Sequence, residues 1–377
     1  MESSPHLDIR DVIAAPAHAL SAKQVLVVVL GLCGGLLVFD LFYYMGVIAE
    51  GQAPRGVFAI YGFLPFGADS FQNTVAQAFF YVGAALGIFV LMLSLFGVSA
   101  IHVEAVRGNR FFSARGAIKF AFQRWKQLAY SELAIILFVL FIIILYALFG
   151  LICRIPFIGE WIYSIFFVIP NFIVGLFVAF ILFILSVSVI LMPAVAAAER
   201  KAESFNVILE TFSTVIRQPL RWVAYTAYTF IAAKLCSFIY AYFAYRAVQF
   251  VTLSSAIGGG DSIERVVRSG LSHLPTRSDF VYQVLNVFPG IRWGITPPAN
   301  GYFMTTDSTA GYVMALMLFL IFASVIGYGL AIIAAGQARA YAVIRYVKDG
   351  YKISDEKPLF AEEVAAEEKL EGERNGN

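Results

Sequence analysis

Two charged residues lie inside long apolar runs of the sequence, and they are the first candidates for chemistry. Asp40 belongs to a run that begins at Val25, and Lys234 belongs to a run that begins at Trp222. If both runs are helices that cross a membrane in the same direction, both side chains lie roughly 18 to 22 Å from the side where the helices start. An ionisable group at that depth is costly, so each is a functional hypothesis by default.

Two interpretations of Asp40 and Lys234 are open. As a functional pair, they would form a proton or ion relay, or a polar site for a substrate. As a structural pair, they would fix which helices pack together, or Lys234 would extend toward the membrane surface. The sequence has no histidine and no second acidic residue in the middle of a predicted span, which favours the structural interpretation.

Other residue types that carry catalysis or bind metals are sparse. No histidine has a second histidine at a metal-ligand interval, and the phosphate-loop, serine-hydrolase and zinc-protease motifs do not occur. His102 and Glu104 are close in sequence, and a polar pair at a membrane surface explains them more simply than a metal site. The cysteines follow no redox or zinc spacing: Cys33, Cys153 and Cys236. The sequence therefore predicts no catalytic residue, no metal site and no cofactor.

The amino-acid composition indicates that most of the chain lies in a membrane. Of 377 residues, 60% are hydrophobic and only 14% are charged, with a mean hydropathy of +0.78. A soluble domain carries charge on about a quarter of its residues, so the apolar excess must face lipid. The net charge of +2 is too small for nucleic acid to be a partner, and the basic residues cluster near the ends of the apolar runs instead of forming a stripe.

The apolar runs predict an all-α, polytopic membrane helix bundle. A bilayer core about 30 Å thick needs roughly 20 apolar helical residues. Six segments satisfy this rule: 25–48, 75–101, 129–152, 168–197, 222–249 and 310–337. Pro170 would break or kink a continuous fourth helix, so residues 156–169 either lie at the membrane interface or re-enter the membrane.

Basic residues indicate the orientation of the spans. Lys and Arg are concentrated in the segments 103–128 and 199–221 and near the C-terminus, which lie on one side if there are six spans. The positive-inside rule makes that side cytoplasmic. We therefore expect a multi-pass protein of the cell inner (plasma) membrane with both termini in the cytoplasm.

This topology divides the chain into three parts. Residues 1–24 form a cytoplasmic N-terminal segment, and residues 25–345 form the transmembrane domain with an extracytoplasmic loop at 250–309. Residues 346–377 contain many glutamates and are predicted to be a mobile, acidic cytoplasmic tail.

Small residues indicate how the helices pack and suggest an internal repeat. Glycine and alanine recur at four-residue intervals that let helices approach closely, and the glycines of this pattern are Gly31, Gly35, Gly83, Gly87 and Gly327. Each even-numbered span ends in small residues followed by charge, and the first two then lead into an amphipathic stretch. The charges of this pattern are Glu104 and Arg107, Glu199 and Arg200, and Arg339. A helical hairpin used two or three times explains this pattern.

One region resembles a known family. From Pro193 to Tyr225 an apolar span ends in Ala-Ala-Ala-Glu-Arg, an amphipathic stretch follows with Phe205 and Phe212, and Arg-Gln-Pro-Leu-Arg-Trp enters the next span. This resembles a broad group of bacterial polytopic membrane proteins that includes the membrane domain attached to some glycerophosphodiester phosphodiesterases. The likeness covers the region from about 75 to 250. It implies a six-helix bundle and assigns no catalytic residue.

Three hypotheses of function follow from the sequence. The first is a non-enzymatic scaffold or accessory subunit of a membrane assembly, with the lipid bilayer and other membrane proteins as partners. The second is a transporter or channel that uses Asp40 and Lys234, with Pro170 interrupting a span. The third is a lipid-handling membrane enzyme, because the basic cytoplasmic segments would attract anionic head groups.

Overall fold

The fold is entirely helical in the part of the chain that the structure describes. The structure is a computed structural model, and it describes residues 6–61, 71–156, 158–166, 170–200, 203–274 and 305–358. Within these ranges every regular element is a helix. The predicted all-α fold class is confirmed.

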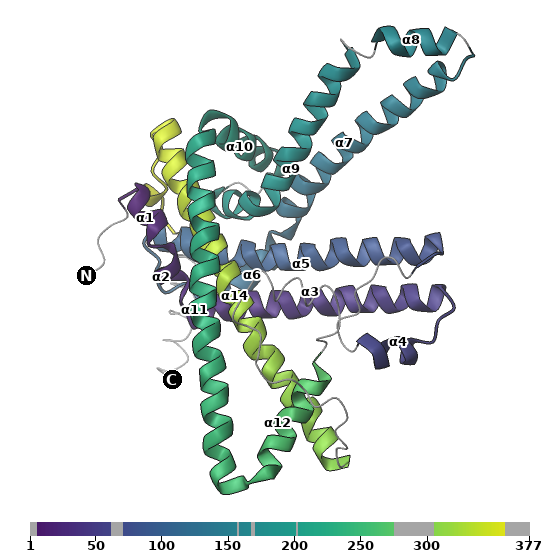
Figure 1. Ribbon diagram of the computed structural model, residues 1–377. Coiled ribbons are helices and arrows are strands. Elements are labelled where there is room, and N and C mark those ends of the chain that lie inside the picture. The colour runs from purple at the N-terminus through teal and green to yellow at the C-terminus, as the bar shows by residue number, and fades with distance from the viewer. Residues whose placement is uncertain are drawn as a thin grey trace, which may run out of the picture. The chain divides into compact units, whose positions relative to one another are not determined.

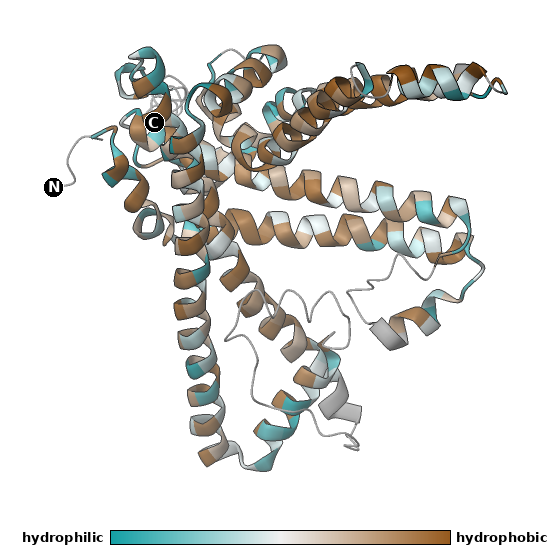
Figure 2. Cartoon of the chain, turned by 45° about the horizontal axis from the view of Figure 1, so that its top comes forward, coloured by the Kyte–Doolittle hydropathy of each residue, from teal (hydrophilic) through white to brown (hydrophobic). Residues whose placement is uncertain are grey.

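Six helices among the described residues are long and apolar enough to cross a membrane. They are α3 (Ala22–Ala49), α5 (Thr74–Val106), α7 (Trp125–Cys153), α9 (Phe172–Ala198), α11 (Pro219–Gly259) and α14 (Thr305–Asp349). Hydrophobic residues predominate along most of these helices, and hydrophilic residues interrupt α11 more often (Figure 2). The protein is therefore a multi-pass integral membrane protein.

The helices match the six predicted spans, but several extend beyond them. The helix α11 continues ten residues past the predicted end at 249, and α14 continues to Asp349. An apolar run reports the thickness of the bilayer, whereas helical hydrogen bonds continue through the polar residues that follow. The predicted loop 250–309 consequently begins with the end of α11 and with a further helix, α12 (Asp261–His273). Residues 275–304 of that loop lie outside the described residues.

The fourth span is not broken by a proline at its start. Pro170 lies between α8 (Ile158–Phe166) and α9, just before the span begins at Phe172. A proline is tolerated there because the first backbone N–H groups of a helix have no intrahelical acceptor. The placement of residues 156–169 at the interface or inside the membrane stays a prediction.

The order of elements repeats three times along the chain. The long helices form three hairpins, α3 with α5, α7 with α9, and α11 with α14. A short helix follows the first long helix of each hairpin, namely α4 (Pro54–Tyr61), α8 and α12. Short helices also precede each hairpin: α1 (Ile9–Ile13) and α2 (Ala15–Ala19), α6 (Ala114–Gln123), and α10 (Ser204–Arg217). We call the end where the chain enters and leaves a hairpin its base, and the opposite end its tip.

The chain separates into two compact units. The first contains residues 1–12, 99–226 and 337–377, and the second contains residues 13–98 and 227–336. Three long helices, α5, α11 and α14, contribute residues to both units. The α7–α9 hairpin belongs to the first unit, where α10 packs against both of its helices.

In the second unit, α3 and α5 run side by side (Figure 1), and glycines set their close approach. A Cβ atom on Gly35 would lie 2.6 Å from the carbonyl oxygen of Gly87, and one on Gly31 would lie 2.2 Å from Cβ of Ser94. Real Cβ atoms do not come so close to these atoms, so the hairpin requires glycine there. Gly83 lies in the same way against Phe42.

The remaining glycine of the predicted packing set belongs to α14. A Cβ atom on Gly327 would lie 3.0 Å from Cγ2 of Val29 on α3. The small residue therefore lets α14 approach α3 within the second unit. The helix α14 also contacts α11, where Ser324 of α14 shares a 3.1 Å hydrogen bond with the hydroxyl of Tyr240.

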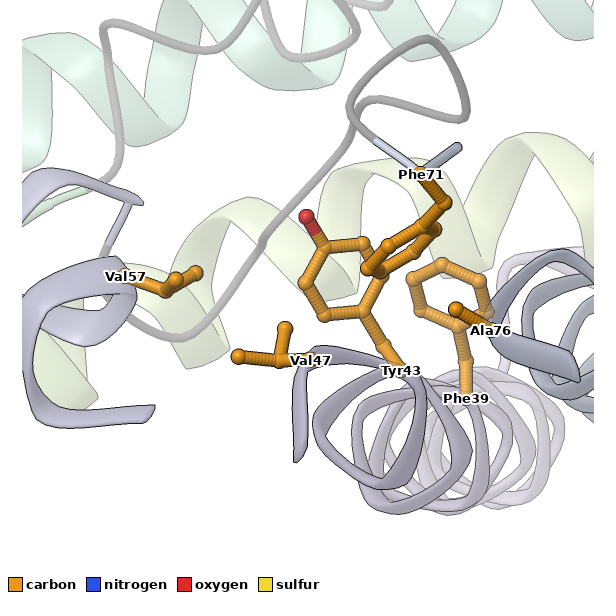
Figure 3. Packing of buried hydrophobic residues seen from close by; sticks show 6 residues of the cluster. All are labelled: Phe39, Tyr43, Val47, Val57, Phe71 and Ala76. Carbon is orange, nitrogen blue, oxygen red and sulfur yellow. The ribbon is translucent and has the colours of Figure 1, made fainter. Parts of the chain in front are cut away.

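A hydrophobic cluster with aromatic pairs joins α4, through Val57, to the tip of the α3–α5 hairpin. Phe71, which precedes α5, packs against Tyr43 of α3 with ring centroids 5.2 Å apart. Figure 3 shows this cluster, which consists of Phe39, Tyr43, Val47, Val57, Phe71 and Ala76. Such pairs stabilise more than their buried area alone, so this tip is a small hydrophobic core.

The tip of the third hairpin is filled by α12. Val267 and Leu271 on α12 pack against Leu318 of α14, with Val248 of α11 at the edge of the cluster. A Cβ atom on Gly270 of α12 would lie 2.5 Å from the Met314 side chain. The helix α12 therefore packs closely on α14 (Figure 1).

Candidate functional site

Charged residues of the first unit gather where the even-numbered spans end. They follow the small-residue ends of α5 and α9 or lie near the end of α14 and just beyond it. We call this group the base cluster, which consists of Glu104, Arg107, Glu199, Arg200, Arg345 and Glu356. The sequence repeat pointed to the first four of these residues, and the structure brings them together with the last two.

Arg107 is the centre of the base cluster, and its side chain is fully buried. Its Nη1 atom donates to Oε1 of Glu104 at 3.0 Å, and Nε and Nη2 donate to Oε2 of Glu356 at 2.9 and 2.6 Å. Nη2 also donates to the carbonyl oxygen of Ala198 at 2.6 Å. The planar guanidinium thus joins the end of α5, the end of α9 and a segment near the C-terminus.

The segment after α14 is held in place by this arginine. Gly350 ends the helix with a φ of +66°, a left-handed conformation that glycine adopts at low cost. Beyond it, Ile353 is fully buried and Glu356 accepts from Arg107, Arg200 and the hydroxyl of Tyr351. We call residues 350–358 the C-terminal strap.

The strap changes the interpretation of the acidic tail. Residues 346–349 of the predicted mobile segment belong to α14, and residues 350–358 form the strap, while residues 359–377 lie outside the described residues. An acidic segment is expected to be solvated only if its carboxylates find no cation partner in the folded protein. Here the buried Arg107 pairs with Glu356 of this segment.

The electrostatics of the strap favour a charged Glu356. Burial alone would raise the pKa of this carboxyl, but hydrogen bonds from Tyr351, Arg107 and Arg200 and the positive charge of Arg107 outweigh it. The pKa of Glu356 is therefore held below its usual value. The carboxylate is ionised at neutral pH and keeps its two arginine partners.

Further ion pairs surround this centre. Nη1 of Arg345 on α14 donates to Glu199 at 2.7 Å, and Nζ of Lys348 donates to Glu210 on α10 at 2.7 Å. Arg124 donates to the carbonyl oxygens of Glu199 and Arg200 and so caps the end of α9. Buried cations are stable only when they are paired. This arrangement therefore holds helix ends in fixed positions.

The two predicted intramembrane residues are not joined in this structure. Asp40 is half-buried, and its Oδ1 atom is buried without a hydrogen-bond partner. Lys234 is exposed on α11. No ion pair links the two among the described residues. Their pairing stays a prediction. Because Lys234 is exposed, its charge faces the surroundings of α11.

A third intramembrane charge escaped the sequence analysis. Glu132 on α7 is buried, and the hydroxyl of Ser188 on α9 lies 3.0 and 3.2 Å from its two carboxylate oxygens. The predicted span began at 129, which placed Glu132 at its edge. Because α7 begins at Trp125, Glu132 lies about two turns into the helix. The sequence feature that could have identified Glu132 is an acidic residue inside an apolar run. It was overlooked because the predicted span began at 129, four residues after the start of α7.

Two negative findings apply to the part of the chain that the structure describes. No three or more His, Cys, Asp and Glu side chains gather there in a way that could hold a metal ion. Cys33, Cys153 and Cys236 are free cysteines.

Comparison with known proteins adds no further constraint. The chain matches no protein-family model, no curated protein and no solved structure. The resemblance to the membrane domain of some glycerophosphodiester phosphodiesterases therefore stays an untested expectation.

Proposed function

We propose that this protein is a scaffold or accessory subunit of a larger assembly in the inner (plasma) membrane, with both termini in the cytoplasm. One observation carries the proposal: Lys234 presents a charge on the exposed face of a membrane span. A partner protein would cover that charge.

The position of Lys234 makes exposure to lipid unfavourable. Residues 222–245 contain one charged side chain, Lys234, midway between Arg221 and Arg246. At about 1.5 Å per residue, Lys234 is about 18 to 20 Å from either arginine. The four-carbon stem of lysine is much shorter than that distance, so the ammonium group cannot extend to the membrane surface. A lysine at the centre of a lone span costs about 2.5 to 3.5 kcal/mol.

The base cluster fits a scaffold. Its buried cations are paired with carboxylates or cap a helix end, so it fixes the ends of α5, α9 and α14 within the first unit. A rigid base of this kind supports spans that act as binding surfaces. Exposed basic residues near this cluster support its cytoplasmic placement, since such residues favour the cytoplasmic side: Arg115, Lys119, Lys126, Arg217 and Arg221.

Gentle detergent extraction from the native membrane tests the proposal. The tagged full chain would be purified without harsh solubilisation, and the intact complex would be weighed by mass spectrometry. A stoichiometric second membrane protein is the expected result. A lone chain, or a complex that contains only copies of this chain, would refute the proposal. Accessibility of tags at the two termini from the cytoplasmic side tests the orientation.

A second candidate function is transport, and intramembrane carboxylates favour it. Asp40 keeps a buried oxygen without a hydrogen-bond partner, and Glu132 is buried against a serine hydroxyl. Carboxylates in spans often mark proton or ion pathways. Transport predicts that the pure protein moves a solute into liposomes and that Asp40→Asn abolishes the flux while the protein still folds. Liposomes with wild-type protein that show no flux would exclude it.

A further inference from the structure

The exposed charge of α11 lies in a continuous stripe of residues. Helical spacing places five exposed side chains on one face of the helix, and they are Ile231, Lys234, Phe238, Tyr242 and Arg246. We call them the α11 stripe. One other face of the same helix is covered within the second unit, where Ala241 is buried against Val325 of α14. The stripe therefore belongs to the exposed side of a helix that is packed on another side.

The two cations of the stripe differ in their surroundings. Arg246 stacks on the ring of Tyr242 at 5.3 Å, and its Nη1 atom donates to Oε1 of Gln249 at 3.0 Å. Lys234 has no ion-pair or hydrogen-bond partner among the described residues. Lys234 is thus the cation of the stripe that lacks a polar partner among the described residues, one turn from Phe238 and two turns from Tyr242.

We propose that the α11 stripe docks a transmembrane helix of a partner protein that carries a carboxylate at the depth of Lys234. This inference rests on the proposed function and names the chemistry of the partner. In a membrane, a charged side chain is stabilised best by an opposite charge, because water is absent. Phe238 and Tyr242 supply aromatic surface beside the ion pair for the partner helix to pack on.

Charge complementarity favours a different protein over a second copy of this chain. Within the described spans, the carboxylates away from the helix ends are Asp40 and Glu132, and neither is exposed. A second copy therefore offers no exposed carboxylate at the required depth. A small-residue contact alone would not explain the position of Lys234, since lysine does not aid close packing of helices.

A defined probe tests the charge preference directly. The probe is a synthetic leucine–alanine transmembrane peptide with one aspartate at its midpoint, compared with the same peptide carrying lysine. Energy transfer to the fluorescently labelled full chain in phosphatidylcholine vesicles measures binding. We expect the aspartate peptide to bind the wild-type protein at least about tenfold more tightly. The preference should vanish in Lys234→Met, which keeps the length of the side chain, and persist in Lys234→Arg.

The matched control is Arg221→Met, which removes an exposed charge from the base end of the same helix. It should keep the aspartate preference. Equal binding of both peptides to the wild-type protein, or a preference that survives in Lys234→Met, overturns the proposal. Lys234→Arg guards against a folding defect, because it restores the charge and must restore the preference.

The native complex separates the failure of this inference from that of the proposed function. If wild-type protein is isolated without a partner, the proposed function fails. If the partner remains bound at full stoichiometry in Lys234→Met, only the docking inference fails. A photo-crosslinker at Phe238 should capture the partner, whereas one at Phe243, which is exposed on another face, should not. Cross-links from Phe238 to a second copy of this chain would also overturn the inference.

Discussion

Replacing Arg107 by methionine tests whether the base cluster stabilises the fold. The Arg107 side chain is fully buried and donates to Glu104, Glu356 and the carbonyl oxygen of Ala198. Without it, Glu104 keeps a side chain only 1% exposed and loses the ion pair with Arg107. Removing one member of a buried ion pair costs about 3 to 5 kcal/mol, because the remaining charge is no longer compensated. We expect Arg107→Met to lower the free energy of unfolding by this amount.

The double variant Arg107→Met/Glu104→Gln separates charge compensation from packing. It removes the buried carboxylate together with its cation, so most of the lost stability should return. Glu356 still accepts from Arg200 and Tyr351 in this variant. A large favourable coupling energy between the two substitutions is therefore expected.

Reversible unfolding in mixed detergent micelles, followed by tryptophan fluorescence, measures these differences. The control is Arg115→Met, which removes an exposed arginine from α6 and should change stability by less than about 0.5 kcal/mol. The reasoning is refuted if Arg107→Met is as stable as Arg115→Met, or if the double variant is less stable than Arg107→Met alone.

Two further predictions concern the strap and the first hairpin. The lowered pKa of Glu356 gives a contribution to stability that is present at neutral pH and is lost as the pH falls through that pKa, below its ordinary value of 4.5. Limited proteolysis measured as a function of pH should show that residues 350–358 become cleavable in acid. In Glu356→Gln they should already be cleavable at neutral pH. Equal protection of the wild-type protein and Glu356→Gln at neutral pH would contradict this. In the first hairpin, Gly35→Val should destabilise the protein by about 1 to 3 kcal/mol, since its Cβ would meet the Gly87 carbonyl oxygen at 2.6 Å. Gly34→Ala, whose Cβ would lie 3.5 Å from Val90, is its control, and equal melting temperatures of the two variants would show that the close approach of α3 and α5 is not needed.

The spans could be predicted from the sequence because the length of an apolar run is a local property. Each predicted segment overlaps one of the six helices, and the errors are at the ends: α9 begins four residues after the predicted start, and α11 and α14 continue as helices beyond the apolar run. The bilayer limits the apolar part of a helix and not the helix itself. The short helices α6 and α10 also follow from local amphipathic patterns, whereas α4 and α12 were not predicted.

The base cluster could be predicted only in part. The repeated pattern of small residues followed by charge marked Glu104, Arg107, Glu199 and Arg200, but it did not show which charges pair. Arg107 and Glu356 are separated by 249 positions, and no periodicity relates them. The strap was missed for the same reason, because an acidic composition does not reveal that one of its carboxylates meets two arginines.

The contact between Arg107 and Glu356 also determines when the base cluster can form during synthesis of the chain. A ribosome that adds roughly 5 to 20 residues per second needs on the order of 10 to 50 s to synthesise the 249 positions between them. During that interval Arg107 can already contact Glu104, but Glu356 does not yet exist. Glu356 follows the last long helix, α14, in the chain. The base cluster can therefore close only after the last span has been made, and a chain truncated before the strap would leave Arg107 without its second carboxylate.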